Sequence, residues 1–371
     1  MEYDELVYAC AVNRIFNYSC DKARDLVWRF SRPSEIFSLN RRELTDIFGR
    51  GSHFIDEILN PLQLERGRED VEWAYTHNVR IYYIQDSDYP WRLKECPDAP
   101  VVLYFRGNGD MNSARVISIV GSRKMTDYGK RACEEILESL AELESPPLIV
   151  SGLAYGVDIT AHKAALRLGL PTIGAMATGL DTIYPSFHRS VAAQMLECGG
   201  VVSDFPPKTS PVAINFIRRN RIIAGLADAT ILIESTKDGG GMITAKMARS
   251  YDREVFAVPG GIYDKLSEGC NLLIKESYAE MVTGKNSVRS SLGWKNISKD
   301  RNMRAKFLIF ESDNECKKGI VGVLYEHKKA TVDDLLDRTG FGRGELMTNI
   351  TELELEGRIE SDLIGYFTLK I

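Results

Sequence analysis

The sharpest electrostatic feature of this 371-residue chain is a run of three arginines in four positions. Arginine suits phosphate forks and stacking on bases, and the span from 205 to 227 contains no acidic residue. A solvated run of charge is the usual alternative, but apolar residues flank the arginines, which predicts an ordered, partly buried helix. The residues concerned are Arg218, Arg219 and Arg221 around Asn220, with Lys208 as a further cation and Phe205 as an aromatic platform for a base.

Two glycine turns that follow apolar runs could supply further phosphate contacts. One run ends in Gly121, Ser122 and Arg123, and the next ends in Ser151 and Gly152. Glycine lets the backbone approach a phosphate closely, and N–H groups at a helix start point toward it. Neither turn is a G-x-G-x-x-G fingerprint and no Walker lysine follows, so a nucleotide or nucleic-acid phosphate fits better than NAD or ATP with magnesium. The alternative is that both turns are purely structural.

No set of residues with catalytic or metal-binding spacing stands out. Asp158 and His162 share a helix face, but neither has a third partner, and we expect Asp158 to cap the helix instead. The serines of the glycine turns lack a neighbouring histidine, and no paired carboxylates have a catalytic spacing. Glu234, near the glycines at 239–241, is the one plausible acid. Seven cysteines without a C-x-x-C pair suggest no metal site and predict reduced thiols in a cytoplasm.

The elements that must position these residues alternate between short apolar strands and helices. Strands at 116–120, 148–150, 172–177, 229–233 and 254–258 predict an α/β fold with a Rossmann-like, doubly wound, mostly parallel sheet. In such a sheet ligands bind beyond the carboxyl ends of the strands. Because every glycine-rich break follows an apolar run, we expect these breaks to gather along one edge of the sheet.

Composition and patterning divide the chain into four parts. Residues 1–70 are predicted to form a small helical domain, with a helix-hairpin-helix-like turn at 47–52 that is alternatively a plain glycine turn. Residues 71–284 hold a two-stranded extension followed by the sheet. Residues 285–306 form a basic linker, which is either solvated or in contact with DNA. Residues 307–371 are predicted to form three helices and a hairpin, the plan of a winged helix.

The charge of the C-terminal part argues against duplex recognition. From 307 to 371 there are 13 Asp and Glu against 8 Lys and Arg, a net charge of −5. The helix expected at 344–356 holds four glutamates and no cation, with only Arg343 at its entrance, so the phosphate backbone would repel it. We expect a protein-contact or regulatory module with a core that includes the apolar residues Leu346, Ile350, Leu353 and Leu355.

Whole-chain composition restricts the class of protein further. A hydrophobic content of 44% with 27% charged residues is typical of a globular protein. No apolar run approaches the roughly 20 residues that span a bilayer, and the first residues lack a signal-peptide pattern. We therefore expect a cytoplasmic protein without membrane contact. The net charge of −5 argues against a general polycation but allows a local basic groove.

A series of short motifs occurs in a distinctive order along the chain. The pieces are Val120-Gly121-Ser122-Arg123, Tyr128-Gly129, Ser151-Gly152-Leu153-Ala154, Gly156-Val157-Asp158, Ala161-His162, Tyr184-Pro185, Arg219-Asn220-Arg221-Ile222-Ile223-Ala224-Gly225-Leu226, Ile243-Thr244-Ala245, Val258-Pro259-Gly260 and Gly269-Cys270-Asn271. Each piece alone is weak, but their order and spacing together are highly specific. In this set the chain resembles the DNA-processing protein A family, also called DprA or Smf, over nearly its whole length.

The resemblance implies a non-enzymatic protein that binds single-stranded DNA on its Rossmann-like domain and loads RecA recombinase onto it, chiefly in natural transformation. It also implies a homodimer formed through that domain. Three departures from the family pattern affect local loop shape. His188 stands where asparagine is frequent after Tyr-Pro, Asp204 stands where glutamate is usual, and Ile217 replaces the proline that usually follows Phe216.

A nucleotide-binding glycosidase that cleaves nucleoside monophosphates is the alternative of related architecture. Its Pro-Gly-Gly-x-Gly-Thr run is missing, because Ile262 and Tyr263 follow Gly261. We therefore interpret the chain as a single-stranded-DNA-binding protein without catalytic residues, metal or cofactor. The expected DNA-binding residues are Gly121, Ser122, Arg123, Lys124, Ser151, Gly152, Phe205, Lys208, Arg218, Arg219, Asn220, Arg221, Gly240 and Thr244.

Overall fold

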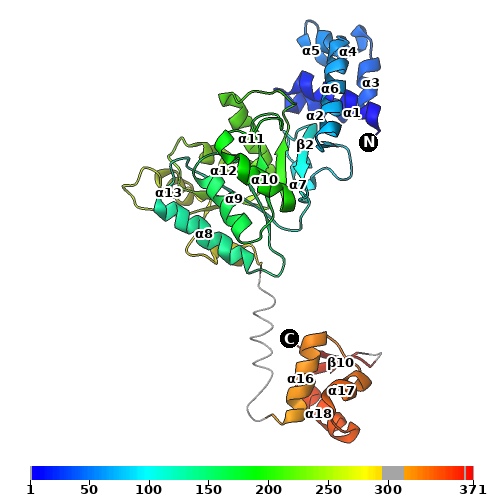
Figure 1. Cartoon of the computed structure of the whole chain (residues 1–371), viewed down its shortest axis with the longest axis vertical. Helices are drawn as coiled ribbons and strands as arrows, with labels where there is room; N and C mark the ends of the chain where they lie inside the picture. Colours follow the sequence, from blue (N-terminus) through cyan, green and yellow to red (C-terminus); the bar gives the residue numbers. More distant parts are fainter. Residues whose placement is uncertain (1, 295–312, 363–364, 371) are drawn as a thin grey trace. The chain divides into compact units, whose positions relative to one another are not determined.

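The computed structural model describes residues 2–294, 313–362 and 365–370, and it divides the chain into two compact units (Figure 1). The first unit comprises residues 1–293 and contains a large sheet, and the second comprises residues 294–371. Each unit has a separate hydrophobic core. We describe the two units one at a time.

The first unit is built on a nine-stranded sheet in the order β1-β2-β6-β5-β4-β3-β7-β8-β9. All neighbours from β6 to β9 pair in parallel, which confirms the predicted Rossmann-like, doubly wound, mostly parallel fold. Their buried, β-branched sequences suit strands covered on both faces. The parallel strands are β3 (Val116–Gly121), β4 (Leu148–Ser151), β5 (Thr172–Ala175), β6 (Gly200–Ser203), β7 (Ala229–Ile233), β8 (Glu254–Ala257) and β9 (Glu280–Met281).

Helices connect the parallel strands and cover both faces of the sheet. The chain leaves β3 in one direction through β4, β5 and β6, and leaves β7 in the other direction through β8. Right-handed crossovers in opposite directions place their helices on opposite faces. The helices are α8 (Asp127–Ala141), α9 (Val157–Arg167), α10 (Arg189–Cys198), α11 (Ala213–Leu226), α12 (Gly240–Ser250) and α13 (Glu268–Lys275), with a 3-10 turn at Ser186–His188.

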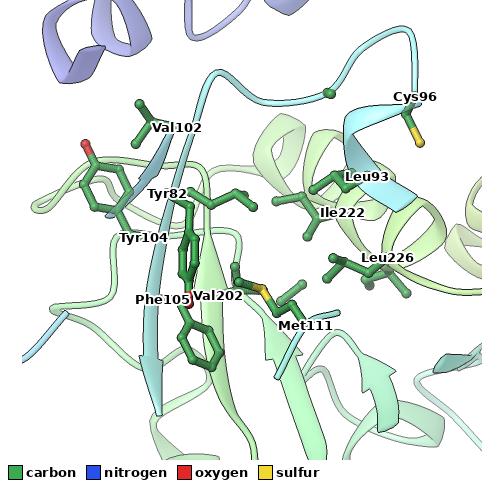
Figure 2. Close-up of a cluster of buried hydrophobic side chains, with 14 of the residues drawn as sticks. Tyr82, Leu93, Cys96, Val102, Tyr104, Phe105, Met111, Val202, Ile222 and Leu226 are labelled. Atoms are coloured by element: carbon green, nitrogen blue, oxygen red, sulfur yellow. The ribbon is translucent and has the colours of Figure 1, made fainter. Parts of the chain in front are cut away.

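The predicted extension before the sheet adds two antiparallel strands to it. Strand β2 (Val102–Gly107) pairs with β6, and β1 (Arg80–Tyr83) pairs with β2. Between them lies the short helix α7 (Trp91–Lys94), which packs against α11. Figure 2 shows Leu93 of α7 beside Ile222 and Leu226 of α11, within the cluster that also holds the side chains of β1 and β2. The apolar side of α11 is therefore fixed by this extension.

Six short helices form the N-terminal part of the first unit. The longest two, α1 and α6, pack against each other, and α1 also contacts β1 and β2. The core is continuous from these helices into the sheet. The expected domain boundary at residue 70 falls inside α6, where Asp70 accepts two hydrogen bonds of 2.6 Å from Arg14 of α1. The helices are α1 (Tyr3–Phe16), α2 (Cys20–Val27), α3 (Pro33–Ser38), α4 (Arg41–Phe48), α5 (His53–Ile58) and α6 (Leu62–Thr76).

Two glycines shape the turn between α4 and α5, where a helix-hairpin-helix-like turn was expected. Gly49 and Gly51 have φ of +82° and +80°, a backbone conformation that favours glycine. A glycine turn is therefore present between the two helices, and its helix-hairpin-helix-like character stays a prediction.

The end of the first unit departs from the predicted linker. Helix α14 (Ser287–Ser291) packs on α8, where Arg289 donates a 3.0 Å hydrogen bond to the Ser139 carbonyl. A linker starting at residue 285 is therefore wrong for this stretch, which is part of the first unit. The basic residues expected at 295–306 lie outside the described residues.

The described residues of the second unit form three helices and a two-stranded hairpin, as expected from the sequence. Its core includes Leu346, Ile350 and Leu353, but Leu355 is 84% exposed and does not belong to it. The winged-helix assignment stays a prediction. Across the described parts of both units, no helix combines the length and apolar character needed to cross a membrane. The elements are α16 (Glu315–His327), α17 (Val332–Thr339), α18 (Arg343–Leu355), β10 (Ile359–Ser361) and β11 (Phe367–Leu369).

Candidate functional site

A cavity of about 520 Å³ lies at the switch point of the sheet, beyond the carboxyl ends of β3 and β7. The two strands are neighbours, and the chain departs from them in opposite directions, which is where doubly wound folds bind ligands. We call this cavity the switch-point pocket. The expected residues that line it are Gly121, Ser122, Arg123, Arg219, Asn220, Gly240 and Thr244.

The first turn of α12 forms one wall of the switch-point pocket. Its N-cap is Gly239, which provides no capping side chain, so the N–H groups of Gly240 and Gly241 have neither a side-chain cap nor an intrahelical acceptor. A Cβ on Gly241 would lie 3.1 Å from the Cα of Gly121 at the end of β3. Because Gly241 and Gly121 lack side chains, the start of α12 can lie close to the end of β3. An uncapped helix start carries partial positive charge and favours a bound anion.

A cation and two aromatic rings stand at the rim of the pocket. The guanidinium of Arg123 lies 5.4 Å from the ring centroid of Phe216, and that ring meets Tyr184 edge to face at 5.6 Å. Arg123 and Tyr184 are exposed. Aromatic faces beside an arginine provide stacking surfaces for bases next to a phosphate site. Phe216 and Tyr184 were not among the expected site residues, although Phe216 is three residues before Arg219 and so shares its helix face.

Arg219 forms a buried wall of the pocket. Its guanidinium donates hydrogen bonds to the carbonyls of Gly152 and Ala175, which follow β4 and end β5. Burial lowers the pKa of Arg219 to about 10, against the opposing effect of the Asp158 carboxylate, so the side chain stays charged at neutral pH. A Cβ on Gly152 would lie 2.5 Å from both the Arg219 guanidinium and the Asp158 carboxylate. Gly152 thus contributes a carbonyl and space for Arg219.

The other two arginines of the run point away from the pocket. Each residue of a helix turns by about 100°, so neighbouring arginines face different directions. Arg221 is buried and forms an ion pair with Asp204. Arg218 donates a 2.8 Å hydrogen bond to Asn17, at the end of α1. The expectation that all three arginines bind phosphate is therefore wrong for Arg221, whose charge is already paired inside the protein.

Phe205 does not provide the expected free platform for a base. Its side chain is 1% exposed, and its ring lies 5.6 Å from the guanidinium of Arg218. A buried ring has no face available to a nucleotide. Phe205 instead packs near the guanidinium of Arg218.

Several backbone and side-chain donors expected to take phosphates are already engaged. The N–H of Ser122 donates to the Glu234 carbonyl at 2.8 Å, and the hydroxyl of Ser151 donates to the Ile119 carbonyl at 2.5 Å. Ser122 therefore contributes only its side chain and the shape of the turn to the pocket. Ser151 is fully buried. Lys124 and Lys208 are exposed and lie outside the pocket lining.

The acidic and histidine residues considered for catalysis are tied into the fold. Asp158 does not cap α9, because the N-cap of that helix is Gly156. The Asp158 carboxylate instead accepts a 3.2 Å hydrogen bond from the Ala154 N–H. Glu234 accepts hydrogen bonds from the N–H and hydroxyl of Thr126. His162 is fully buried and contacts the Thr172 hydroxyl at 2.7 Å. Among the described residues, no group of three or more His, Cys, Asp or Glu is placed to hold a metal ion.

The sheet and its switch-point pocket define a protein of the Rossmann-like class. The chain belongs to the DNA recombination-mediator protein A family, whose model matches residues 80–293. It is 41% identical over 202 residues to DNA processing protein DprA of Streptococcus pneumoniae, covering 54% of this chain and 70% of that protein. It is 34% identical over 300 residues to protein Smf of Escherichia coli, covering 80% of this chain and 79% of that protein.

Two solved structures of the same family share this fold. The structure of DprA from Streptococcus pneumoniae superposes with a TM-score of 0.55 at 34% identity, covering 68% of this chain and 92% of that one. A structure of DNA processing protein A from Helicobacter pylori, which concerns the single-stranded DNA binding mode of that protein, gives a TM-score of 0.52 at 26% identity. It covers 58% of this chain and 95% of that one. The family assigned from the sequence motifs is confirmed.

Proposed function

We propose that this chain binds single-stranded DNA in the switch-point pocket and delivers it to a RecA-type recombinase, as expected for DNA processing in transformation. The observation that carries the binding proposal is the combination, in one pocket, of an uncapped helix start, the exposed cation Arg123 and the rings of Phe216 and Tyr184. Helix N–H groups and arginine hold phosphates, and the rings stack bases without reading their sequence.

The state of two acidic residues supports binding rather than catalysis, and the aromatic rings support single strands rather than duplex. Both acids near the strand ends, Asp158 and Glu234, already accept internal hydrogen bonds, so neither is positioned as a free base. A base can stack on a ring only when it is unpaired or flipped out of a helix. Binding should therefore tolerate sequence and favour single strands.

The proposal also includes a homodimer formed through the sheet-containing unit and a cytoplasmic location.

Removing the exposed cation of the pocket should weaken binding without affecting folding. In Arg123→Ala we expect affinity for a labelled oligothymidine to fall about tenfold, which is the scale of one charged hydrogen bond. The dependence of log affinity on log salt should flatten by about 0.7 for each phosphate that the variant no longer binds. Fluorescence anisotropy across a salt series measures both quantities. Arg131→Ala on α8, an exposed arginine outside the pocket, is the matched control.

Two outcomes of that titration would contradict the proposed function. An unchanged salt slope in Arg123→Ala would show that Arg123 does not bind a phosphate. Equal or tighter binding of wild type to a blunt duplex would remove the strand preference. Incubation of the protein with AMP is a separate test, in which release of adenine would favour the nucleotide glycosidase alternative.

The acidic second unit should contribute little to DNA affinity. Lys317 is already paired with Glu352 and Glu356 at 2.8 Å, and Glu345 lies in the first turn of α18. A chain that ends at Gly293 should bind oligothymidine within a few fold of the full chain, because the phosphate backbone is repelled by such a surface. Loss of binding in the shortened chain, with an unchanged unfolding transition, would show that the second unit contacts DNA.

A further inference from the structure

Tyr18, in the loop between α1 and α2, is an aromatic side chain that is exposed and yet held in place. It is 64% exposed, while its hydroxyl donates a 3.2 Å hydrogen bond to the Asn215 side chain in the first turn of α11. The guanidinium of Arg218 lies 4.1 Å from the centroid of its ring. One face of the ring is thus supported by a cation. The tyrosine is ordered before any ligand arrives, which reduces the entropy cost of binding.

The supporting cation is itself fixed and not neutralised. Arg218 donates to Asn17 at 2.8 Å and to the sulfur of Cys20 at 3.5 Å, and its guanidinium lies 5.6 Å from the ring centroid of Phe205. In the described part of the chain, no carboxylate lies within ion-pair distance of Arg218. We call the Tyr18 ring and the Arg218 guanidinium the stack. It presents an exposed aromatic face together with an uncompensated positive charge, the combination that suits a base and its neighbouring phosphate.

Beside this stack lies a second cavity, of about 370 Å³, between the N-terminal helices and the loop before α11. We call it the N-terminal groove. Of the described residues that line it, only Glu57 is acidic, and its carboxylate accepts a hydrogen bond from Gln63. Arg66 lines the groove, is exposed and has no carboxylate within ion-pair distance among the described residues. Lys208, also exposed, stands in the loop that lines the groove on the other side.

The N-terminal groove and the switch-point pocket are close neighbours. Thr209 lines the groove and Pro211 lines the pocket. Two residues of backbone span at most about 7 Å, which is within the reach of one or two nucleotides. On α11, Phe216 and Arg219 line the pocket, while Asn215 and Arg218 hold Tyr18. One helix therefore carries contacts for both sites on adjacent faces.

We propose that a bound single strand leaves the switch-point pocket over the start of α11 and continues along the N-terminal groove. One base stacks on Tyr18, and the adjoining phosphates lie near Arg218, Arg66 and Lys208. This inference rests on the proposed function, since it extends the same strand to a second contact. It assigns the N-terminal helices a direct part in binding.

Oligonucleotide length separates the second contact from the first. Tyr18→Ala should weaken binding of an oligothymidine of about 15 nucleotides roughly tenfold, the lower range for one stacked base, and leave one of about 5 nucleotides unchanged. Tyr18→Phe keeps the ring and should retain affinity for both lengths. Tyr75→Ala is the matched control, because Tyr75 is a 62% exposed aromatic residue of the N-terminal helix α6 and stacks only on Tyr3 among the described rings.

A second variant tests the phosphate contact without touching the stack. Arg66→Ala should flatten the salt dependence by about 0.7 for the longer oligonucleotide and leave the shorter one unaffected. Equal losses of affinity for both oligonucleotide lengths in Tyr18→Ala would mean that the tyrosine only supports α11. Unchanged affinity for both lengths would mean that Tyr18 does not contact the strand. Both results overturn the inference while the pocket assignment stands. Failure of the wild-type chain to bind either length would overturn the proposed function itself.

Discussion

Replacing Arg221 with Ala should lower the free energy of unfolding by about 3–5 kcal/mol, because it leaves a buried carboxylate without its partner. Arg221 and Asp204 are 4% and 1% exposed and form an ion pair, and Arg221 also donates to the Asp98 carbonyl. Burial lowers the pKa of Arg221, but the Asp204 carboxylate outweighs this effect and the net pKa is raised. Chemical denaturation of a chain ending at Gly293 measures the loss without the second unit's transition.

Two further variants identify the cause of that loss. Adding Asp204→Asn to Arg221→Ala should recover part of the stability, because the buried group left behind is then neutral. Arg41→Ala should have little effect, since its ion pair with Asp56 is exposed on both sides. If Arg221→Ala weakened DNA binding at unchanged stability, Arg221 would be a phosphate ligand after all, as the arginine run first predicted.

Acidification should destabilise the first unit through His162. The Thr172 hydroxyl donates to the Ile149 carbonyl, so it accepts from the Nδ1–H of His162, and among the described groups Nε2 has no partner. Burial, with the charge of Arg219 as the second cause, lowers the pKa of His162 to about 3. An unfolded histidine titrates near 6.5. The stability from neutral His162 is therefore present above about pH 6.5 and is lost as the pH falls toward 3.

The expected slope is about 1.4 kcal/mol per pH unit below pH 6.5. Asp158, whose pKa is raised by burial against the effect of Arg219, acts in the opposite direction at the acidic end of this window, because the folded state then takes up a proton more readily. His162→Asn keeps an amide donor for Thr172 and should flatten the dependence between pH 6.5 and 5. The exposed His77→Asn is the control. An unchanged slope in His162→Asn would assign the proton uptake to another group.

The sheet and the edge at which its glycine breaks gather could be predicted because both depend on local sequence. Runs of β-branched residues define buried strands, and glycines directly after them mark where the backbone must turn or approach a neighbour. Gly121 and Gly240 were therefore placed at one edge without any knowledge of strand order. The position of β2 beside β6 could not be derived in this way, because nothing local to Val102–Gly107 specifies a partner almost one hundred residues later.

The roles of the three arginines could not be separated from sequence alone. The helical period shows that Arg218, Arg219 and Arg221 face different directions, but the direction that meets the pocket depends on how α11 rests on the sheet. The partners that decide each role, Asn17 and Asp204, come from distant segments. The role of Tyr18 could not be predicted for the same reason, because only the folded position of α11 brings Arg218 against its ring.

An uncapped helix start does not discriminate among anions. Gly239 supplies no side chain to the first turn of α12, so under the proposed function we expect inorganic phosphate, sulfate and free nucleotides to compete with a DNA strand for the same N–H groups. Affinities compared between phosphate and other buffers will therefore differ even at equal ionic strength. By the same reasoning, we expect free nucleotides in a cell to occupy part of these sites, and an incoming strand must then displace them. Strands that reach several contacts at once displace small anions more easily than short ones.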